Sequence, residues 1–197
     1  MILTVYNFKG GVGKTSIALN IALSLDMGII TNDVYSPIEN ILPEKQFIKL
    51  EKDMSIPEIP EGMNIVFDLG GYIDTRAIEA LRQSDKVLIP VTNDFINLQV
   101  TINAIDEIWE FNENLIIIAN RTVKDDFSDI SQGIKQFYDF PVLELKQSKV
   151  FSNLFQEKKS IRDIVRQGGL RAYSYRAINE QFDQLLNVIG GAGWELI

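Results

Sequence analysis

The chain of 197 residues contains no cysteine and no histidine. Without cysteine there is no disulfide, no thiolate metal site and no iron–sulfur cluster, and such a composition is typical of a cytoplasmic protein. Without histidine, no reaction here uses an imidazole as a base or as a metal ligand. What remains is the chemistry of lysine, aspartate, threonine and a hard cation. Phosphoryl transfer from a nucleotide to water requires no more than that.

Long apolar runs are also absent. No run approaches the ~20 residues that a membrane-spanning helix needs. Basic residues are outnumbered by acidic ones, 19 against 27, and no lysine or arginine follows Arg176 to attract an anionic lipid surface. A membrane partner is therefore not expected. With 46% hydrophobic and 23% charged residues, the sequence predicts one globular domain over residues 1–197.

The most informative segment is residues 9–15, which read Lys-Gly-Gly-Val-Gly-Lys-Thr. The GxxGK[ST] pattern is that of a phosphate-binding loop: backbone N–H groups cradle phosphates, Lys14 reaches the β- and γ-phosphates, and the Thr15 hydroxyl holds Mg²⁺. An apolar run at 1–7 predicts a strand before the loop, and the periodicity of 16–25 predicts a helix after it. This order favours a nucleotide site over the alternative, a glycine-rich turn that only joins a strand to a helix.

Apolar runs alternate with helical periodicity along the chain. Strands are expected at 1–7, 28–33, 47–50, 64–68, 86–91, 115–120 and 141–145, and helices at 16–25, 74–83, 98–111 and 126–138. The basic C-terminal segment 151–190 is expected to form two helices separated at Gly168-Gly169, the second over 172–189, and 190–193 is expected to fray. The alternation predicts an α/β fold, a single-domain P-loop NTPase with a mainly parallel twisted sheet and helices on both faces.

Polar residues end three of the expected strands. Ligands of such sheets bind at the carboxyl ends of the strands, where Asp33, Asp68 and Asn120 lie. Asp68 follows the apolar residues 65–67, which matches a Walker B pattern whose Asp holds Mg²⁺ through water. The alternative is an Asp that caps a turn at the end of the strand.

The lysine directly before Gly-Gly-Val-Gly-Lys-Thr resembles the deviant Walker A motif of the ParA/MinD ATPases, and the short chain resembles the ParA/Soj-type partitioning ATPases among them. The resemblance implies an ATPase that forms a homodimer on ATP, in which Lys9 reaches across to the phosphates that the partner subunit holds. It also implies slow hydrolysis until a ParB-like or other partner protein stimulates it. The missing cysteines exclude the iron-protein branch of the family, which needs them for its cluster.

Asp33 lies in residues 31–35, Thr-Asn-Asp-Val-Tyr, where partitioning ATPases carry an Asp-x-Asp-Pro-Gln pattern. Only the second Asp matches. The resemblance implies that Asp33 positions the attacking water or belongs to the Mg²⁺ shell, and a loop residue that turns the chain is the alternative. Residues 70–74, Gly-Gly-Tyr-Ile-Asp, occupy the place of a switch loop that senses the γ-phosphate, with a plain glycine turn as the alternative.

Asn120 and Arg121 follow an apolar strand. The family often uses an Asn here to read the adenine edge, with which an amide can exchange a donor and an acceptor, and a strand-end cap is the alternative. The candidate nucleotide-binding residues are thus Lys9, Gly10, Gly11, Val12, Gly13, Lys14, Thr15, Ser16, Asn120 and Arg121, the candidate catalytic residues are Lys9, Lys14 and Asp33, and the candidate Mg²⁺ residues are Thr15, Asp33 and Asp68.

Residues 158–176 carry six basic residues against one acid, Asp163, on a chain with a net charge of −8. The six are Lys158, Lys159, Arg162, Arg166, Arg171 and Arg176. Because Lys158, Arg162 and Arg166 recur every fourth residue, they are expected along one helix face. Such a stripe favours non-specific, salt-sensitive contact with the DNA backbone. A solvated helix face with local salt bridges is the alternative.

Together with its resemblance, the sequence predicts a Mg²⁺-dependent ATPase for plasmid or chromosome partitioning. It is expected to bind non-specific DNA as an ATP homodimer, associated with the nucleoid, and to be stimulated by a partner protein. A ParA-like positioning ATPase for a protein cargo or membrane site is one alternative, and a non-hydrolysing ATP-gated scaffold is another. These classes share the nucleotide site and differ in their surfaces, so the sequence separates them poorly.

Overall fold

The computed structural model describes residues 1–71 and 73–190, with the backbone alone for 95–97. The expected frayed end at 190–193 lies outside the described residues except for Gly190, and Tyr72 of the expected switch loop also lies outside them. No helix in the described ranges is long and apolar enough to cross a membrane.

Seven strands form one sheet, and every strand pair in it is parallel. The strands are β1 (Ile2–Asn7), β2 (Gly28–Thr31), β3 (Phe47–Lys49), β4 (Ile65–Gly70), β5 (Lys86–Val91), β6 (Leu115–Thr122) and β7 (Val142–Lys146), in the order β3-β2-β4-β1-β5-β6-β7. All seven expected strands are present, and the prediction of a mainly parallel sheet is confirmed.

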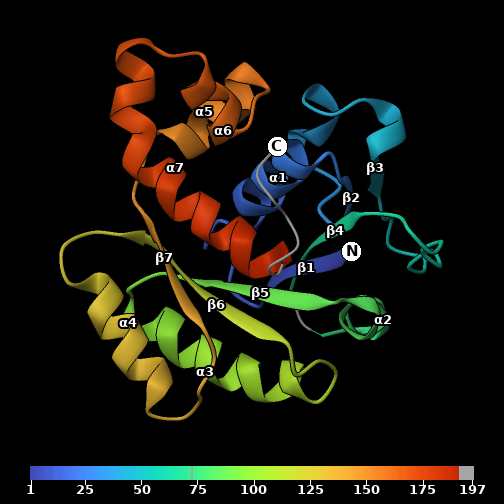
Figure 1. The fold of residues 1–197 in the computed structure, drawn as a ribbon. Coiled ribbons are helices and arrows are strands. Elements are labelled where there is room, and N and C mark those ends of the chain that lie inside the picture. Colours follow the sequence, from blue (N-terminus) through green and yellow to red (C-terminus); the bar gives the residue numbers. More distant parts are fainter. Residues whose placement is uncertain (72, 191–197) are drawn as a thin grey trace.

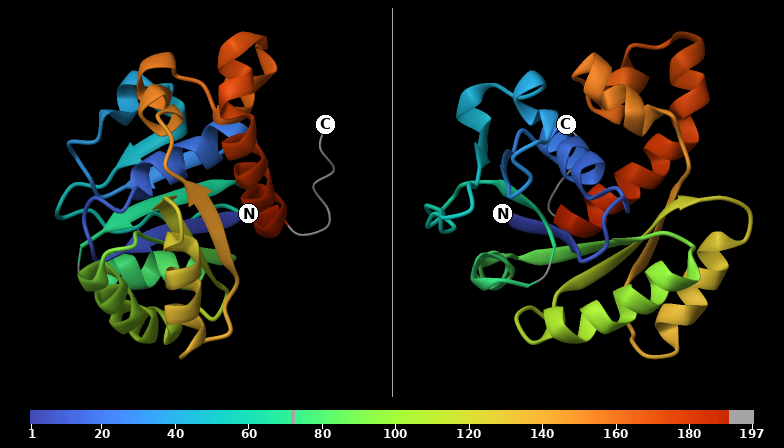
Figure 2. Two further views of the ribbon diagram at one scale, coloured as in Figure 1. Left: turned by 90° about the vertical axis from the view of Figure 1, so that its left-hand side faces the viewer. Right: turned by 180° about the vertical axis from the view of Figure 1, so that it is seen from behind.

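Helices cover both faces of the sheet (Figures 1 and 2). They are α1 (Lys14–Leu25), α2 (Thr75–Gln83), α3 (Phe95–Trp109), α4 (Asp126–Lys135), α5 (Val150–Glu157), α6 (Ile161–Arg166) and α7 (Gly169–Gly190), with short 3-10 turns η1 (Pro37–Asn40) and η2 (Glu44–Gln46). Helices α1, α5, α6 and α7 pack on one face, and α2, α3 and α4 pack on the other. The predicted α/β fold with helices on both faces is therefore confirmed.

The apolar runs of the strands are explained by burial on both faces. Along β6, Ile116 and Ile118 belong to the core beneath α1 and α7, whereas Leu115 and Ile117 belong to the core beneath α3 and α4. A strand that alternates between two dry layers needs no polar face, so it reads as a continuous hydrophobic run. Polar residues in the middle of a strand, such as Thr4 in β1 and Glu144 in β7, are the exceptions.

Strand register brings the polar strand ends together. β1 lies between β4 and β5, so the loop after β1 rises at the point where the strand order changes direction. Asn7 is level with Gly70, and Thr31 is level with Asp68. The loops after β1, β2 and β4 therefore meet at one edge of the sheet.

The C-terminal segment differs from the prediction, because it contains three helices in place of two. The division at Gly168-Gly169 is present, with both residues at positive φ, but α5 already ends at Glu157. Lys158 adopts the left-handed conformation (φ 56°) as the C-cap of α5. Ser160 and Asp163 then form a capping box that starts α6.

The prediction that Lys158 shares a helix face with Arg162 and Arg166 is therefore wrong. Lys158 caps α5, whereas the two arginines belong to α6. A four-residue spacing places side chains on one face only while the helix continues. Here the capping box at Ser160 interrupts it.

Candidate nucleotide-binding site

The loop from β1 to α1 leaves the first turn of α1 without a side-chain cap. Gly13 is the N-cap residue in a left-handed conformation (φ 96°), and the first turn contains no acid. Gly11 also has positive φ (78°), and a Cβ there or at Gly10 would meet nothing within 4 Å. Uncapped N–H groups at the positive end of a helix dipole, next to open space, form a site for an anion.

A cavity of about 450 Å³ lies in front of this helix end. Its lining residues are Gly10, Gly11, Gly13, Lys14, Thr15, Ser16, Asn32, Asp33, Asp68, Leu69, Gly70 and Arg121. The fold thus gathers most of the predicted site from four separate loops. Of the other predicted site residues, Val12 and Asn120 are buried beneath the loop, and Lys9 is exposed beside the cavity.

The ammonium group of Lys14 has no acid partner within the described ranges. Its Nζ donates a hydrogen bond to the Lys9 carbonyl at 2.9 Å. Burial lowers the pKa of Lys14, while the carboxylates of Asp68 and Asp33 act in the opposite direction. A partly desolvated cation that bonds only to a neutral carbonyl gains most from an anionic ligand.

Asp68 lies at the floor of the cavity with 3% of its surface exposed. Burial raises the pKa of its carboxyl group to about 6, although hydrogen bonds from Thr15 and Thr31 and the charge of Lys14 lower it. A divalent cation beside the carboxylate would offset the burial and keep it ionised. A hydroxyl and a carboxylate are hard oxygen donors, so Thr15 and Asp68 fit Mg²⁺.

Asp33 lies at the exposed rim of the same cavity. Its Oδ1 accepts a hydrogen bond from the Tyr35 N–H at 3.1 Å, so it does turn the chain as the alternative interpretation proposed. It also lines the cavity in front of α1, so turning the chain does not exclude a role in that cavity.

Sequence reasoning noted Thr31 only as a departure from an Asp. The Thr31 hydroxyl donates to Asp68 Oδ2 at 3.4 Å and accepts from the Asp33 N–H at 3.1 Å. It therefore joins the predicted metal residue to the loop of the predicted water-positioning residue. No local pattern signals this role, because it depends on β2 pairing with β4.

Asn7 was also missed, and it fixes the start of the phosphate loop. Its Oδ1 accepts from the Lys9 N–H at 2.9 Å, and its Nδ2 donates to the Pro90 carbonyl at 2.8 Å and to Thr101 Oγ1 at 3.0 Å. The side chain is fully buried. An Asn directly after an apolar strand and two residues before Lys9 was the available signal.

Asn120 and Arg121 hold the other side of the loop. Asn120 Nδ2 donates to the Val12 carbonyl at 2.7 Å, and a Cβ on Gly13 would lie 2.3 Å from that nitrogen. Arg121 Nη1 donates to the Gly11 carbonyl at 2.9 Å. Asn120 is 3% exposed, so this geometry makes it a brace of the loop, and its adenine-reading role stays a prediction.

A second cavity of about 530 Å³ adjoins the first and shares Ser16 and Arg121 with it. Its remaining lining residues are Gln147, Ser148, Lys149, Phe151, Ser152 and Phe155, from the end of β7 and from α5. It combines aromatic rings with amide and hydroxyl groups. Such a lining suits a nucleoside whose phosphates extend into the first cavity.

Three of the six basic residues in the C-terminal segment form salt bridges within the chain. Arg162 Nε lies 3.0 Å from Asp183 Oδ1, Arg176 Nε lies 3.1 Å from Glu180 Oε1, and Arg171 pairs with Glu157. For these three, the local salt-bridge interpretation describes the structure. Lys158, Lys159 and Arg166 are exposed, and the two lysines form no salt bridge within residues 1–71 and 73–190. DNA binding by this segment stays a prediction.

The strand order and the helices on both faces are those of a P-loop NTPase fold of the ParA/MinD type. The chain superimposes on the ATP complex of a McdA variant from Cyanothece with a TM-score of 0.69 and 11% identity, covering 100% of this chain and 98% of that one. For the MinD cell division protein of Aquifex aeolicus the values are 0.60 and 18%, with 100% and 99% covered. For a ParA family ATPase of Chlorobium tepidum they are 0.61 and 15%, with 94% and 98% covered.

No protein-family model matches the sequence, and no curated protein matches it. At these identities the structural likeness establishes the fold alone. What the protein does must therefore be argued from the residues of its site.

Proposed function

We propose that this protein is a Mg²⁺-dependent ATPase that dimerises on ATP and partitions or positions a cargo. The observation that supports it most is the cavity in front of α1, where an uncapped helix end, Lys14 and buried Asp68 converge. Each of these three features costs free energy in an empty site, and a nucleoside triphosphate with its cation offsets that cost. McdA, MinD and ParA-family structures share the fold and include an ATP complex.

In this proposal Lys14 and the α1 N-terminus bind the phosphates, and Thr15 and Asp68 hold Mg²⁺, which would neutralise phosphate charge. Asp33 orients the attacking water from the rim of the cavity. Gln147 and Phe151, with their neighbours in the second cavity, receive the nucleoside. No strong base is near, so slow turnover is expected.

In this proposal Lys9 acts on a second copy of the chain. Its backbone is fixed by Asn7 and Lys14, whereas its side chain is exposed and has no acid partner in the described part of the chain. A lysine whose backbone is fixed and whose ammonium group has no acid partner suits a group that reaches the phosphates of the partner subunit. There it would stabilise the charge that develops during hydrolysis.

The first experiment compares Lys9→Ala, Lys14→Ala and the control Lys45→Ala, which removes an exposed lysine of η2 far from the cavity. Lys14→Ala should weaken ATP binding on the order of 100-fold, because a charge-assisted contact to phosphate is lost. Lys9→Ala should keep ATP binding but lower phosphate release on the order of 100-fold, since its role lies in the transition state. Unchanged turnover in Lys9→Ala would exclude the trans role, and ATP-dependent dimers without any phosphate release would favour the non-hydrolysing scaffold.

In this proposal the ATP dimer binds non-specific DNA. Lys158 and Lys159 are exposed, and dimerisation would double their number and supply avidity on an otherwise acidic protein. Mobility of non-specific duplex DNA should shift with ATP and not with ADP, and Lys158→Ala/Lys159→Ala should abolish the shift. Lys45→Ala/Lys135→Ala, which removes two exposed lysines elsewhere, is the matched control.

A protein cargo is the second candidate, and the salt bridges favour it. Arg162, Arg171 and Arg176 already have acidic partners, so fewer charges remain for phosphate contacts than the sequence suggests. Under this alternative the ATP-dependent dimer forms normally. No DNA shift then appears in any nucleotide state, even at low salt.

A further inference from the structure

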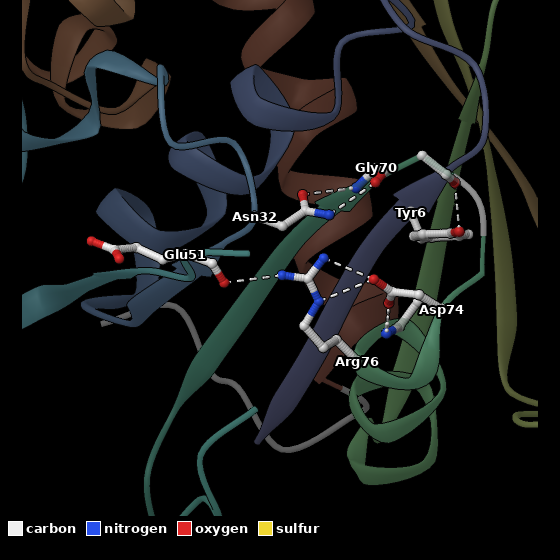
Figure 3. Close-up of polar contacts among 8 residues, drawn as sticks. Tyr6, Asn32, Glu51, Gly70, Asp74 and Arg76 are labelled. Carbon is white, nitrogen blue, oxygen red and sulfur yellow. Dashed lines mark hydrogen bonds and ion pairs between the residues drawn. The ribbon is translucent and has the colours of Figure 1, made fainter. Parts of the chain in front are cut away.

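The dipeptide Gly70-Gly71 after β4 is held from two directions. Asn32 Nδ2 donates to the Gly70 carbonyl at 2.9 Å, and the Gly70 N–H donates to Asn32 Oδ1 at 3.2 Å, so one amide side chain occupies both backbone groups of one residue. Figure 3 shows this pair of bonds, with Asn32 reaching Gly70 from the loop after β2. The second contact comes from β1, where the Tyr6 hydroxyl donates to the Gly71 carbonyl at 2.7 Å.

The Tyr6 contact is built into the core. The Tyr6 side chain has no exposed surface, and Figure 3 shows it pointing from β1 toward the chain that follows Gly70. Burial raises the pKa of Tyr6, and the charges of Asp74 and Glu107 act in the same direction. The phenol therefore stays protonated and remains a donor to the Gly71 carbonyl. The buried Tyr6 hydroxyl therefore fixes the position of the exposed loop at Gly71.

Gly70 also touches the phosphate lysine. A Cβ on Gly70 would lie 2.8 Å from Lys14 Cε and 3.0 Å from Lys14 Nζ, so a side chain here would require the end of the Lys14 side chain to move. Gly70 lines the cavity in front of α1, and its N–H points to the side chain of Asn32, which lines the same cavity. In this structure that donor is already occupied by Asn32.

Asn32 is covalently adjacent to Asp33, so the bond to Gly70 also fixes the loop of the water-orienting residue. The inner end of this loop is tied to Asp68 through Thr31. Its outer end is held by Lys49, whose Nζ donates to the Val34 carbonyl at 3.2 Å. Between these anchors, the Asn32 amide is the contact that faces the cavity.

We propose that Asn32 and Tyr6 form a latch on Gly70-Gly71 that a nucleoside triphosphate opens. The terminal phosphate accepts the Gly70 N–H in place of Asn32 Oδ1, and the freed Asn32 moves with Asp33. A diphosphate lacks that phosphate and leaves the latch closed. Asn32 is thus a positioning residue that couples the terminal phosphate to the loop of Asp33. This inference rests on the proposed ATPase function.

The test is the affinity for the ATP analogue AMPPNP and for ADP, each with Mg²⁺, measured by calorimetry on the full chain. Asn32→Ala removes the competitor for the Gly70 N–H, so AMPPNP should bind about fivefold more tightly, a factor typical of one hydrogen bond, while ADP binding is unchanged. Tyr6→Phe keeps the ring and should change affinity in the same direction, by about twofold, because it frees only the Gly71 carbonyl. Asn40→Ala, on exposed η1, is the control and should change neither affinity.

Turnover gives an independent readout. In Asn32→Ala, kcat should fall while KM falls as well, because the tighter triphosphate no longer moves Asp33 into place. A purely structural role for Asn32 predicts instead a lower Tm with both nucleotides weakened equally, and that result would overturn the latch. Tyr6→Phe covers the case in which Asn32→Ala does not fold.

The latch and the proposed function fail in distinguishable ways. If the wild-type chain binds neither nucleotide, the ATPase proposal is wrong and the latch falls with it. If the wild type binds both nucleotides while Asn32→Ala and Tyr6→Phe each keep the wild-type ratio of AMPPNP to ADP affinity, only the latch is wrong.

Discussion

The phosphate cavity and the C-terminal helices both contain dense charge, but the fold treats the two regions in opposite ways. At the cavity, Lys14 is partly desolvated without an acid partner and Asp68 is buried with a raised pKa. In the C-terminal helices, salt bridges to acidic residues of the same segment neutralise Arg162, Arg171 and Arg176. A charge that the fold leaves uncompensated marks a ligand site more reliably than a cluster of like charges in the sequence.

The largest expected difference between the two regions is in nucleotide affinity. Lys14→Ala should weaken ATP binding on the order of 100-fold, because a charge-assisted contact to phosphate is lost. Lys158→Ala, in the other region, should leave the Kd for ATP unchanged. Calorimetry with Mg²⁺-ATP measures both, and an equal loss in the two variants would erase the distinction between the regions.

The next effect is on stability, and it depends on pH. Because the Asp68 pKa is raised from 3.8 to about 6 in the folded chain, the folded state binds the proton more tightly, and stability falls as pH rises through this window. Asp68→Asn cannot ionise, so without ligand it should be more stable than wild type above about pH 6, on the order of 3 kcal/mol.

Urea unfolding at pH 7.5 and at pH 3.5 checks this sign. The two proteins should nearly converge at the lower pH, where Asp68 is protonated in the folded state and mostly protonated in the unfolded state. The same variant should lose Mg²⁺-dependent ATP binding. If Asp68→Asn were less stable than wild type at pH 7.5, the carboxylate would be a stabilising group and the contrast with the arginine pairs would disappear.

Smaller effects are expected where charges are paired. Arg162 and Asp183 are both partly shielded, with side-chain exposures of 16% and 27%. Arg162→Ala should destabilise the fold by about 1.5 kcal/mol, because Asp183 loses its basic partner and, among the described residues, keeps only the hydrogen bond from Asn179. Thermal unfolding measures this loss. Asp183→Ala should give a similar value, and the double variant should be less destabilised than the sum of the two single changes.

The smallest effect on stability is expected at Lys158 and Lys159. Both are exposed, so replacing them by Ala should change the free energy of unfolding by less than about 0.5 kcal/mol. Any loss of DNA binding in that double variant would then report a surface contact and not unfolding. A large stability loss would show that these lysines are structural after all.

The sequence was sufficient for the parts of the molecule that are determined locally. The apolar runs located all seven strands, and burial on both faces explains the scarcity of polar positions in the central ones. The phosphate loop was recognisable because its glycines, Lys14 and Thr15 are contiguous. The start of α6 is also encoded locally, since Ser160 and Asp163 form a capping box. This local signal contradicts the single helix that the four-residue spacing of basic residues predicts.

Other parts depend on contacts between distant segments. The acids that neutralise the arginines, such as Glu180 and Asp183, lie outside the basic window. The bonds of Asn32 to Gly70 exist because β2 pairs with β4 in one register. No pattern within either segment encodes that register, so these residues could be assigned a role only from the folded chain.

The braces of the phosphate loop have a consequence for how the protein is made. Asn120 and Arg121 reach back to Val12 and Gly11 across 108 and 110 residues of chain. During synthesis the loop leaves the ribosome early, but its support arrives only once β6 has been translated and has joined the sheet. A nascent chain therefore carries the motif well before the loop is braced, and under the proposed function ATP would stabilise only chains in which β6 has joined the sheet.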